Sequence, residues 1–216
     1  MNPDLLVRAL AAIEPEKIIS LDSFQKACGV TSRSVAKTVL DYLEDHNIGS
    51  VSKNLVKFSG ADRISAAVLA LQMRCDVEQV SRHLSWKDFE KLASELLASF
   101  GYSTRTNVWF VKPRMEIDVV GTSSDGFTIA VDCKHWKRSN LSSISKFSQK
   151  QAERAERLIK YDKTICQVVP VVLTLHAESL RFVGGVPLVP INRFRAFIIE
   201  VKGFLPEIYV APAFRS

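Results

Sequence analysis

Residues 115–134, MEIDVVGTSSDGFTIAVDCK, are the part of the sequence from which we infer the fold class. Two runs rich in β-branched and apolar residues, 115–121 and 127–134, are separated by Ser, Ser, Asp and Gly at positions 123–126. Runs of this kind on either side of a short turn containing glycine predict two neighbouring antiparallel β-strands.

The elements around this stretch predict an α/β domain. A helix closed by Gly101 comes first, three strands follow, and then come a second helix and a strand that is apolar throughout. This order favours a mixed sheet flanked by helices, an αβββαβ core. The expected ranges are 85–100 for the first helix, 103–111, 115–121 and 127–134 for the strands, 143–161 for the second helix, 167–175 for the fourth strand, and a last helix capped by Asn192 and stopped by Gly203.

The first part of the chain has a different pattern, with short helices and a hairpin. Amphipathic helices are predicted from Pro3, over 21–27 and over 32–46, and an alternating strand is predicted over 51–58. Three helices followed by a two-stranded flap resemble a winged helix-turn-helix. We therefore expect three parts: a small winged-helix domain over 1–59, a helical linker over 60–84, and an α/β domain over 85–216.

A winged helix that binds DNA would place the third helix in the major groove. Arg33 and Lys37 would then lie in that groove, and Lys53 and Lys57 on the wing would contact the DNA backbone. Acidic residues also crowd the third helix, so a winged helix that docks on a protein is the alternative.

The positive charge of the chain is local. Net charge is +6, and residues 134–163 hold nine Lys and Arg against three Asp and Glu, so the rest of the chain is neutral. Lysines and arginines that share one helix face favour an anionic partner, which we expect to be DNA, and a solvated helix face is the alternative. The expected DNA-binding residues of this region are Lys137, Arg138, Lys146, Lys150, Arg154 and Arg157.

Three charged residues of the two central strands carry the expected chemistry. Asp132 and Lys134 are two apart and share a face of their strand, and Asp118 lies on the preceding strand beside them. Two neighbouring carboxylates repel each other unless a cation lies between them, and oxygen ligands without His or Cys suit Mg²⁺ or Mn²⁺. A salt bridge between Asp132 and Lys134 without catalysis is the alternative.

These residues, in this order of elements, resemble the PD-(D/E)xK nuclease superfamily. The similarity covers about residues 85–175 and is greatest to Mrr-type restriction endonucleases and archaeal Holliday-junction resolvases. Ile117 stands where the motif has its proline. The resemblance implies a restriction-endonuclease-like fold.

The same resemblance implies roles for individual residues. Asp118, Asp132 and the backbone carbonyl of Cys133 would bind the metal, with Glu90 from the first helix as a further metal-binding and catalytic residue. Lys134 would assist the attacking water. Gln151 on the basic helix would complete the active site, and Gln149 is its alternate.

The resulting hypothesis is a Mg²⁺-dependent DNA endonuclease whose winged helix helps to bind substrate. The alternatives are a nuclease-like DNA-binding or regulatory protein without activity, and a structure-specific Holliday-junction resolvase. Cutting both strands of a duplex would favour a homodimer. No apolar run approaches the ~18 residues of a membrane span, so we expect a cytoplasmic protein with no membrane partner.

Overall fold

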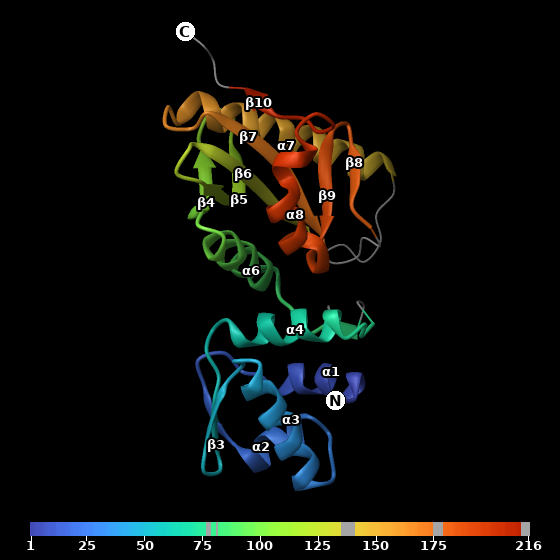
Figure 1. Ribbon diagram of the computed structural model, residues 1–216. Coiled ribbons are helices and arrows are strands. Elements are labelled where there is room, and N and C mark those ends of the chain that lie inside the picture. The colour runs from blue at the N-terminus through green and yellow to red at the C-terminus, as the bar shows by residue number, and fades with distance from the viewer. Residues whose placement is uncertain (77–78, 81, 135–140, 175–178, 213–216) are drawn as a thin grey trace. The chain divides into compact units, whose positions relative to one another are not determined.

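The computed structural model describes residues 1–76, 79–80, 82–134, 141–174 and 179–212. The chain forms two compact units, Met1–Leu92 and Ala93–Ser216, each of which is described by itself. Figure 1 labels the helices and strands of both units. Among the described residues, none of the helices is both long enough and apolar enough to cross a membrane.

The N-terminal unit consists of short helices and a small antiparallel sheet with the strand order β1-β3-β2. Its core contains Leu10, Phe24, Leu43 and Phe58, each at most 1% exposed. Its elements are α1 (Pro3–Ala12), β1 (Ile18–Ser20), α2 (Leu21–Ala27), α3 (Arg33–Asp45), β2 (Ser50–Ser52), β3 (Leu55–Lys57) and α4 (Asp62–Gln72).

Local capping explains where the first two helices begin. The side chain of Asn2 accepts a hydrogen bond from the Asp4 amide at the start of α1, and Ser20 does the same for Ser23 at the start of α2. The single strand expected over 51–58 is wrong. Lys53 has a left-handed φ of 56°, so the chain turns there and forms the β2–β3 hairpin.

The C-terminal unit contains a seven-stranded mixed sheet, which confirms the predicted fold class. The strand order is β4-β5-β6-β7-β9-β8, with β10 paired to β7. Helix α6 (Trp86–Ser99) begins in the N-terminal unit and ends in this one. The other elements are β4 (Ser103–Phe110), β5 (Met115–Thr122), β6 (Phe127–Lys134), α7 (Leu141–Tyr161), β7 (Gln167–Thr174), β8 (Arg181–Val183), β9 (Val186–Pro190), α8 (Ile191–Phe204) and β10 (Ala211–Pro212).

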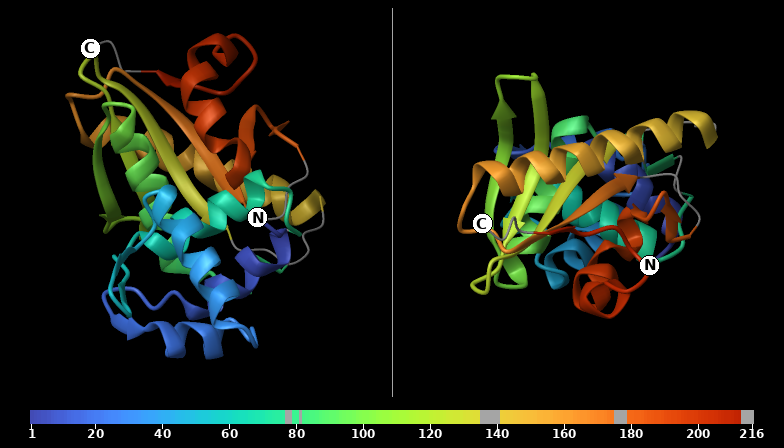
Figure 2. Two further views of the ribbon diagram at one scale, coloured as in Figure 1. Left: turned by 60° about the horizontal axis from the view of Figure 1, so that its bottom comes forward. Right: turned by 90° about the horizontal axis from the view of Figure 1, so that it is seen from above.

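Helices cover both faces of this sheet. Figures 1 and 2 show α7 along one face and α8 on the other. Ala155 and Leu158 of α7 share a buried cluster with Ala130 of β6 and Val168 of β7. Strands β6 and β7 pair in parallel and are almost wholly buried, as expected for central strands with a helix on each side.

Two features of the C-terminal part differ from the sequence-based expectation. The hairpin of β8 and β9 was not predicted, although Gly184 and Gly185 supply the two consecutive left-handed residues that a two-residue hairpin turn needs. Helix α8 begins at Ile191 after Pro190, has no side-chain cap, and includes Gly203. Asn192 is therefore not its cap, and Gly203 does not stop it, because a glycine with an ordinary negative φ can remain helical at a modest cost.

Candidate active site

Asp118 lies where the pairing of β5 with β6 ends. The ladder runs from Thr122 opposite Thr128 to Val119 opposite Val131, so the next opposed pair would be Asp118 and Asp132. At this point a side-chain contact follows the backbone pairing of the two strands: the backbone N–H of Cys133 donates to Asp118 Oδ2 at 2.7 Å. Asp118 is 3% exposed, so this contact holds a buried carboxylate next to the last pair of the β5–β6 ladder.

Asp132 is the most deeply buried carboxylate of this cluster, at 1% exposure. Lys134 Nζ lies 3.0 Å from its Oδ1 and 2.9 Å from its Oδ2, and Arg154 Nη1 lies 2.7 Å from Oδ1. A buried charge is tolerated only when it is paired and hydrogen-bonded. Lys134 and Arg154 therefore make the burial of Asp132 possible, and together they balance the formal charge of Asp118 and Asp132.

Helix α7 supplies the polar side chains that face this cluster. Gln151 is 0% exposed, and its Nε2 donates to the backbone carbonyl of Ala130 at 2.9 Å. Its Oε1 accepts from Arg154 Nη1 at 3.1 Å. The two protons of this guanidinium nitrogen can thus serve Gln151 and Asp132 together, so Gln151 orients Arg154 on the carboxylate.

Lys134 is held from two sides. Besides its ion pair with Asp132, its Nζ lies 5.5 Å from the centroid of the Phe147 ring, a distance at which a cation–π attraction operates. The side chain of Lys134 is 18% exposed. The ammonium group of Lys134 is therefore partly accessible to solvent, whereas the carboxylates of Asp118 and Asp132 are buried.

The basic residues predicted on α7 divide into two groups. Lys146 and Lys150 are exposed, as a phosphate-binding surface requires. Arg154 is only partly exposed and pairs with Asp132, and Arg157 donates to the backbone carbonyl of Lys112. Helical periodicity gives the direction of a Cα–Cβ bond but not the path of a long arginine side chain, so it did not predict these contacts. Lys137 and Arg138 lie outside the described residues.

The remaining predicted residues are on other parts of the chain and are described within their own unit. Glu90 is 8% exposed on the first half of α6, within the N-terminal unit, so its role beside Asp118 stays a prediction. Gln149 is exposed on α7 and contacts Glu153 at 3.4 Å. In the N-terminal unit, Arg33 pairs with Asp22 at 2.8 Å, and Lys37 and Lys53 are exposed.

The chemistry of the cluster fits a hard divalent cation. In the described part of the chain, no three His, Cys, Asp or Glu side chains come close enough to form a complete protein cage for a metal. Mg²⁺, however, usually takes only one or two carboxylates and fills its other positions with water and substrate phosphate. Asp118 and Asp132 are carboxylates of this kind, and their role as metal ligands together with the backbone carbonyl of Cys133 stays a prediction.

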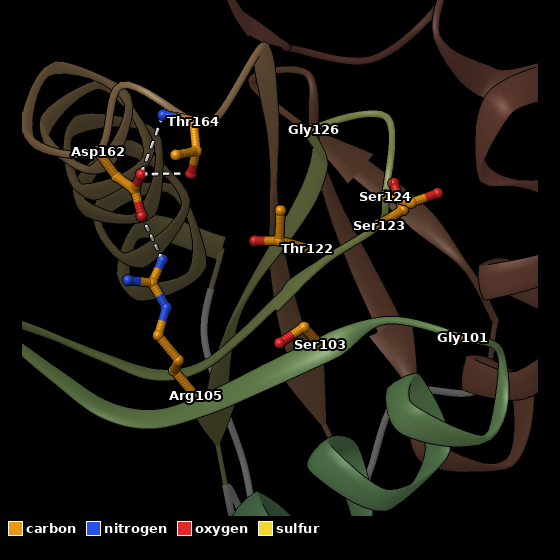
Figure 3. A pocket seen from close by; sticks show the side chains of 9 residues that line it. All are labelled: Gly101, Ser103, Arg105, Thr122, Ser123, Ser124, Gly126, Asp162 and Thr164. Atoms are coloured by element: carbon orange, nitrogen blue, oxygen red, sulfur yellow. Dashed lines mark hydrogen bonds and ion pairs between the residues drawn. The ribbon is translucent and has the colours of Figure 1, made fainter.

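A pocket lies around the turn between β5 and β6, at the opposite end of the β5–β6 ladder from Asp118, and its charged residues pair with each other. It has a volume of about 530 Å³ and is lined by hydroxyl-bearing residues around the β5–β6 turn, with Arg105 and Asp162 as its charged residues. Figure 3 shows these two side chains pointing at each other, and their ion pair measures 2.8 Å. Because the charges cancel, the lining offers no net charge to a ligand.

Two comparisons bear on the class of this domain. Residues 81–160 match the family Mrr_cat, described as restriction endonuclease. The chain is also 28% identical over 128 residues to an uncharacterized protein of Archaeoglobus fulgidus, an alignment that covers 57% of this chain and 97% of that protein. Residues 81–160 thus carry an Mrr-type restriction-endonuclease domain of the PD-(D/E)xK superfamily. A domain of this class indicates a nuclease.

The pairing of Arg154 with Asp132 predicts a measurable coupling. Arg154→Met should lower the free energy of unfolding by about 1.5–3 kcal/mol, because it removes a charged hydrogen bond from a buried carboxylate. Lys150→Met, on the exposed side of the same helix, should change it by less than about 0.5 kcal/mol. Urea unfolding would measure both values. In the Asp132→Asn background the effect of Arg154→Met should shrink, and strictly additive losses would contradict the pairing.

Asp162 predicts a pH dependence of stability. Hydrogen bonds from Thr164, chiefly from its hydroxyl, and the nearby Arg105 hold the pKa of Asp162 below its usual value. The ionised Asp162 side chain should therefore contribute fully to the free energy of unfolding above the pKa of about 4 that it has in the unfolded chain. This contribution should be lost as pH falls through the lower pKa that it has in the folded protein.

Asp162→Ala should cost roughly 1–3 kcal/mol at pH 7, and the difference from wild type should shrink in urea titrations below about pH 4. Arg105→Met should cost less, because its side chain is 45% exposed and surface ion pairs contribute little. A loss for Asp162→Ala that stays constant with pH would contradict this assignment.

Proposed function

We propose that this protein is a metal-dependent endonuclease that hydrolyses phosphodiester bonds of DNA. The observation that carries the proposal is the grouping of Asp118, Asp132 and Lys134 where the pairing of β5 with β6 ends, in an Mrr-type domain. Carboxylates and an ammonium at one spot suit phosphodiester hydrolysis, which needs metal ligands and a cation near the attacking water.

The two carboxylates and the carbonyl of Cys133 would hold Mg²⁺ or Mn²⁺. When bound, such an ion polarises a phosphate oxygen and lowers the pKa of a coordinated water. The protein contributes by holding both acids in place before substrate arrives: the Cys133 amide holds Asp118, and Lys134 with Arg154 holds Asp132. Preorganised ligands reduce the entropy lost on binding.

Lys134 would act on the water and on the developing negative charge. Its ammonium is close to Asp132 and to the Phe147 ring, so its position is constrained while 18% of the side chain stays accessible. A cation held there would orient the attacking water and stabilise the charge that builds on the phosphate in the transition state. Gln151 and Arg154 would act as positioning residues for Asp132.

DNA binding would use the outer side of α7 and the N-terminal unit. Lys146 and Lys150 are exposed on α7, and Lys137 and Arg138 precede this helix in the sequence. The N-terminal unit has the order of helices and strands of a winged helix. In that arrangement Arg33, Lys37 and Lys53 would contact DNA, whereas docking on a protein is the alternative. Cleavage of both strands would use two active sites in a homodimer.

One observation favours a second candidate, a nuclease-like protein that binds DNA without cutting it. Asp132 is already neutralised by two cations, Lys134 and Arg154, so a metal would have to share this carboxylate with them. If both cations remain bound to Asp132 and exclude a metal, the domain would be a DNA-binding or regulatory domain without nuclease activity. Both candidates bind DNA in a salt-sensitive way, and cleavage separates them.

Cleavage assays would test the proposal. Wild-type protein should nick plasmid or branched DNA in Mg²⁺ or Mn²⁺ and lose this activity in EDTA. Lys134→Ala should lower the rate about 100-fold or more, the usual contribution of a positioned proton-transfer group. Lys202→Ala, a change at an exposed lysine of the same unit, should leave the rate within about twofold, a surface effect.

Binding measured by fluorescence anisotropy in EDTA should survive in Lys134→Ala. Cleavage that persists in this variant would contradict the role of Lys134. If the wild-type protein binds DNA but cuts neither plasmid nor branched DNA in Mg²⁺ or Mn²⁺, the result would favour the second candidate, a nuclease-like protein that binds DNA without cutting it.

A further inference from the structure

A cavity of about 480 Å³ is lined in part by Arg157, which is about one helical turn beyond Arg154 on α7, and it has no part in the chemistry described so far. It opens where the end of β4 faces the last turns of α7. We refer to it as the aromatic–basic cavity, because its lining consists of Val111 together with three aromatic and three cationic residues: Trp109, Phe110, Tyr161, Lys112, Arg157 and Lys160.

The aromatic side chains of this cavity are unusually open to solvent. Trp109 is 50% exposed and Tyr161 is 72% exposed, and the adjacent Val111 is 83% exposed. Phe110 is buried at 4%, and its ring meets that of Tyr161 edge to face at 5.7 Å between centroids. A buried phenylalanine thus supports an exposed tyrosine ring. Large apolar groups kept in solvent mark a binding surface when they gather in one place.

The charge of the cavity favours an anionic ligand. No acidic residue is among those that line it in the described part of the chain. Arg157 donates to the backbone carbonyl of Lys112, a neutral group, so this contact leaves its positive charge uncompensated. Arg114 adds a further cation, 5.2 Å from the centroid of the Trp109 ring. Glu116 lies across the ladder from Trp109 but does not line the cavity.

The position of the cavity connects it to the carboxylates. Trp109 pairs with Glu116 on β5, and Glu116 precedes Asp118 by two residues, which is roughly 7 Å along a strand. On α7, Arg157 follows Arg154 by about one helical turn. A nucleic-acid strand with a phosphate at Asp118 and Asp132 can therefore extend over the cavity.

We propose that the aromatic–basic cavity binds an unpaired nucleobase of the substrate strand. Exposed aromatic rings among cations are the arrangement by which proteins hold single-stranded nucleic acid: bases stack on the rings while the cations contact the backbone. A base inside an intact duplex is already stacked on both faces and cannot offer them to Trp109 or Tyr161. A volume of 480 Å³ is within the range of pockets for small organic ligands.

This inference rests on the proposed function and specifies its substrate. The preferred substrate is DNA with unpaired nucleotides next to the scissile phosphate, such as a flap, a loop or a branch, in preference to a fully paired duplex. Opening a base pair costs free energy, and a strand that is already unpaired avoids that cost.

Binding without metal tests the cavity separately from catalysis. Fluorescence anisotropy in EDTA would compare a labelled oligothymidine with a blunt duplex of equal length. Trp109→Ala and Tyr161→Ala should each weaken binding of the single strand roughly tenfold, the effect of losing one stacked base. Binding of the duplex should change less than about twofold, because its bases are not stacked on these rings. Trp109→Phe should retain most of the affinity.

Trp86→Ala is the matched control, because Trp86 is exposed to a similar degree (47%) and does not line the cavity. This variant should bind both oligonucleotides as wild type does. Circular dichroism melts would establish that each variant is folded. In addition, photocrosslinking with 5-iodouracil in the oligonucleotide should attach it to Trp109 or Tyr161, which mass spectrometry would identify.

The outcomes separate the two proposals. If Trp109→Ala and Tyr161→Ala bind the single strand as tightly as wild type, the inference is overturned even when wild-type protein cleaves DNA. If these variants lose single-strand binding while wild type cleaves nothing, the cavity stands as a binding site and the nuclease proposal fails. Equal losses of affinity for the single strand and the duplex would also overturn the inference, because they would indicate a change in electrostatic attraction or in folding and not the loss of base stacking.

Discussion

The structure of the C-terminal unit depends on the burial of one charge, the carboxylate of Asp132. Asp132 is 1% exposed, and the cations that pair with it are Lys134 and Arg154, with N–O distances of 2.9 Å and 2.7 Å. Arg154 comes from α7, so the ion pair also ties this helix to β6. Gln151 strengthens the link by joining Arg154 to the backbone of Ala130. The arrangement that permits a buried acid thus also aligns the candidate catalytic groups.

The sequence was most informative where backbone periodicity alone decides the outcome. Strands β5 and β6, their turn, and the face shared by Asp132 and Lys134 follow from alternation and from Gly126. The contacts of Arg154 could not be predicted, because a long side chain is free to reach solvent or a buried acid, and only the fold decides. The β8–β9 hairpin was missed because its strands are short, although Gly184 and Gly185 carried the signal.

Helix α7 combines three tasks along its length. Its inner side packs on the sheet through Ala155 and Leu158 and presents Gln151 to the carboxylate cluster. Its outer side exposes Lys146 and Lys150, and its end contributes Arg157 and Tyr161 to the aromatic–basic cavity. In our account, one rigid element therefore sets the spacing between the cleaved phosphate, the backbone contacts and the unpaired base.

The proposed active site requires Asp118 and Asp132 to hold one divalent ion together. Isothermal titration calorimetry of the metal-free protein with Mn²⁺ measures this binding without any nuclease activity. We expect one binding site in the wild-type protein that is lost in both Asp118→Asn and Asp132→Asn. Binding that is unchanged in either variant, or a wild-type protein that binds no Mn²⁺ with or without DNA, would contradict it.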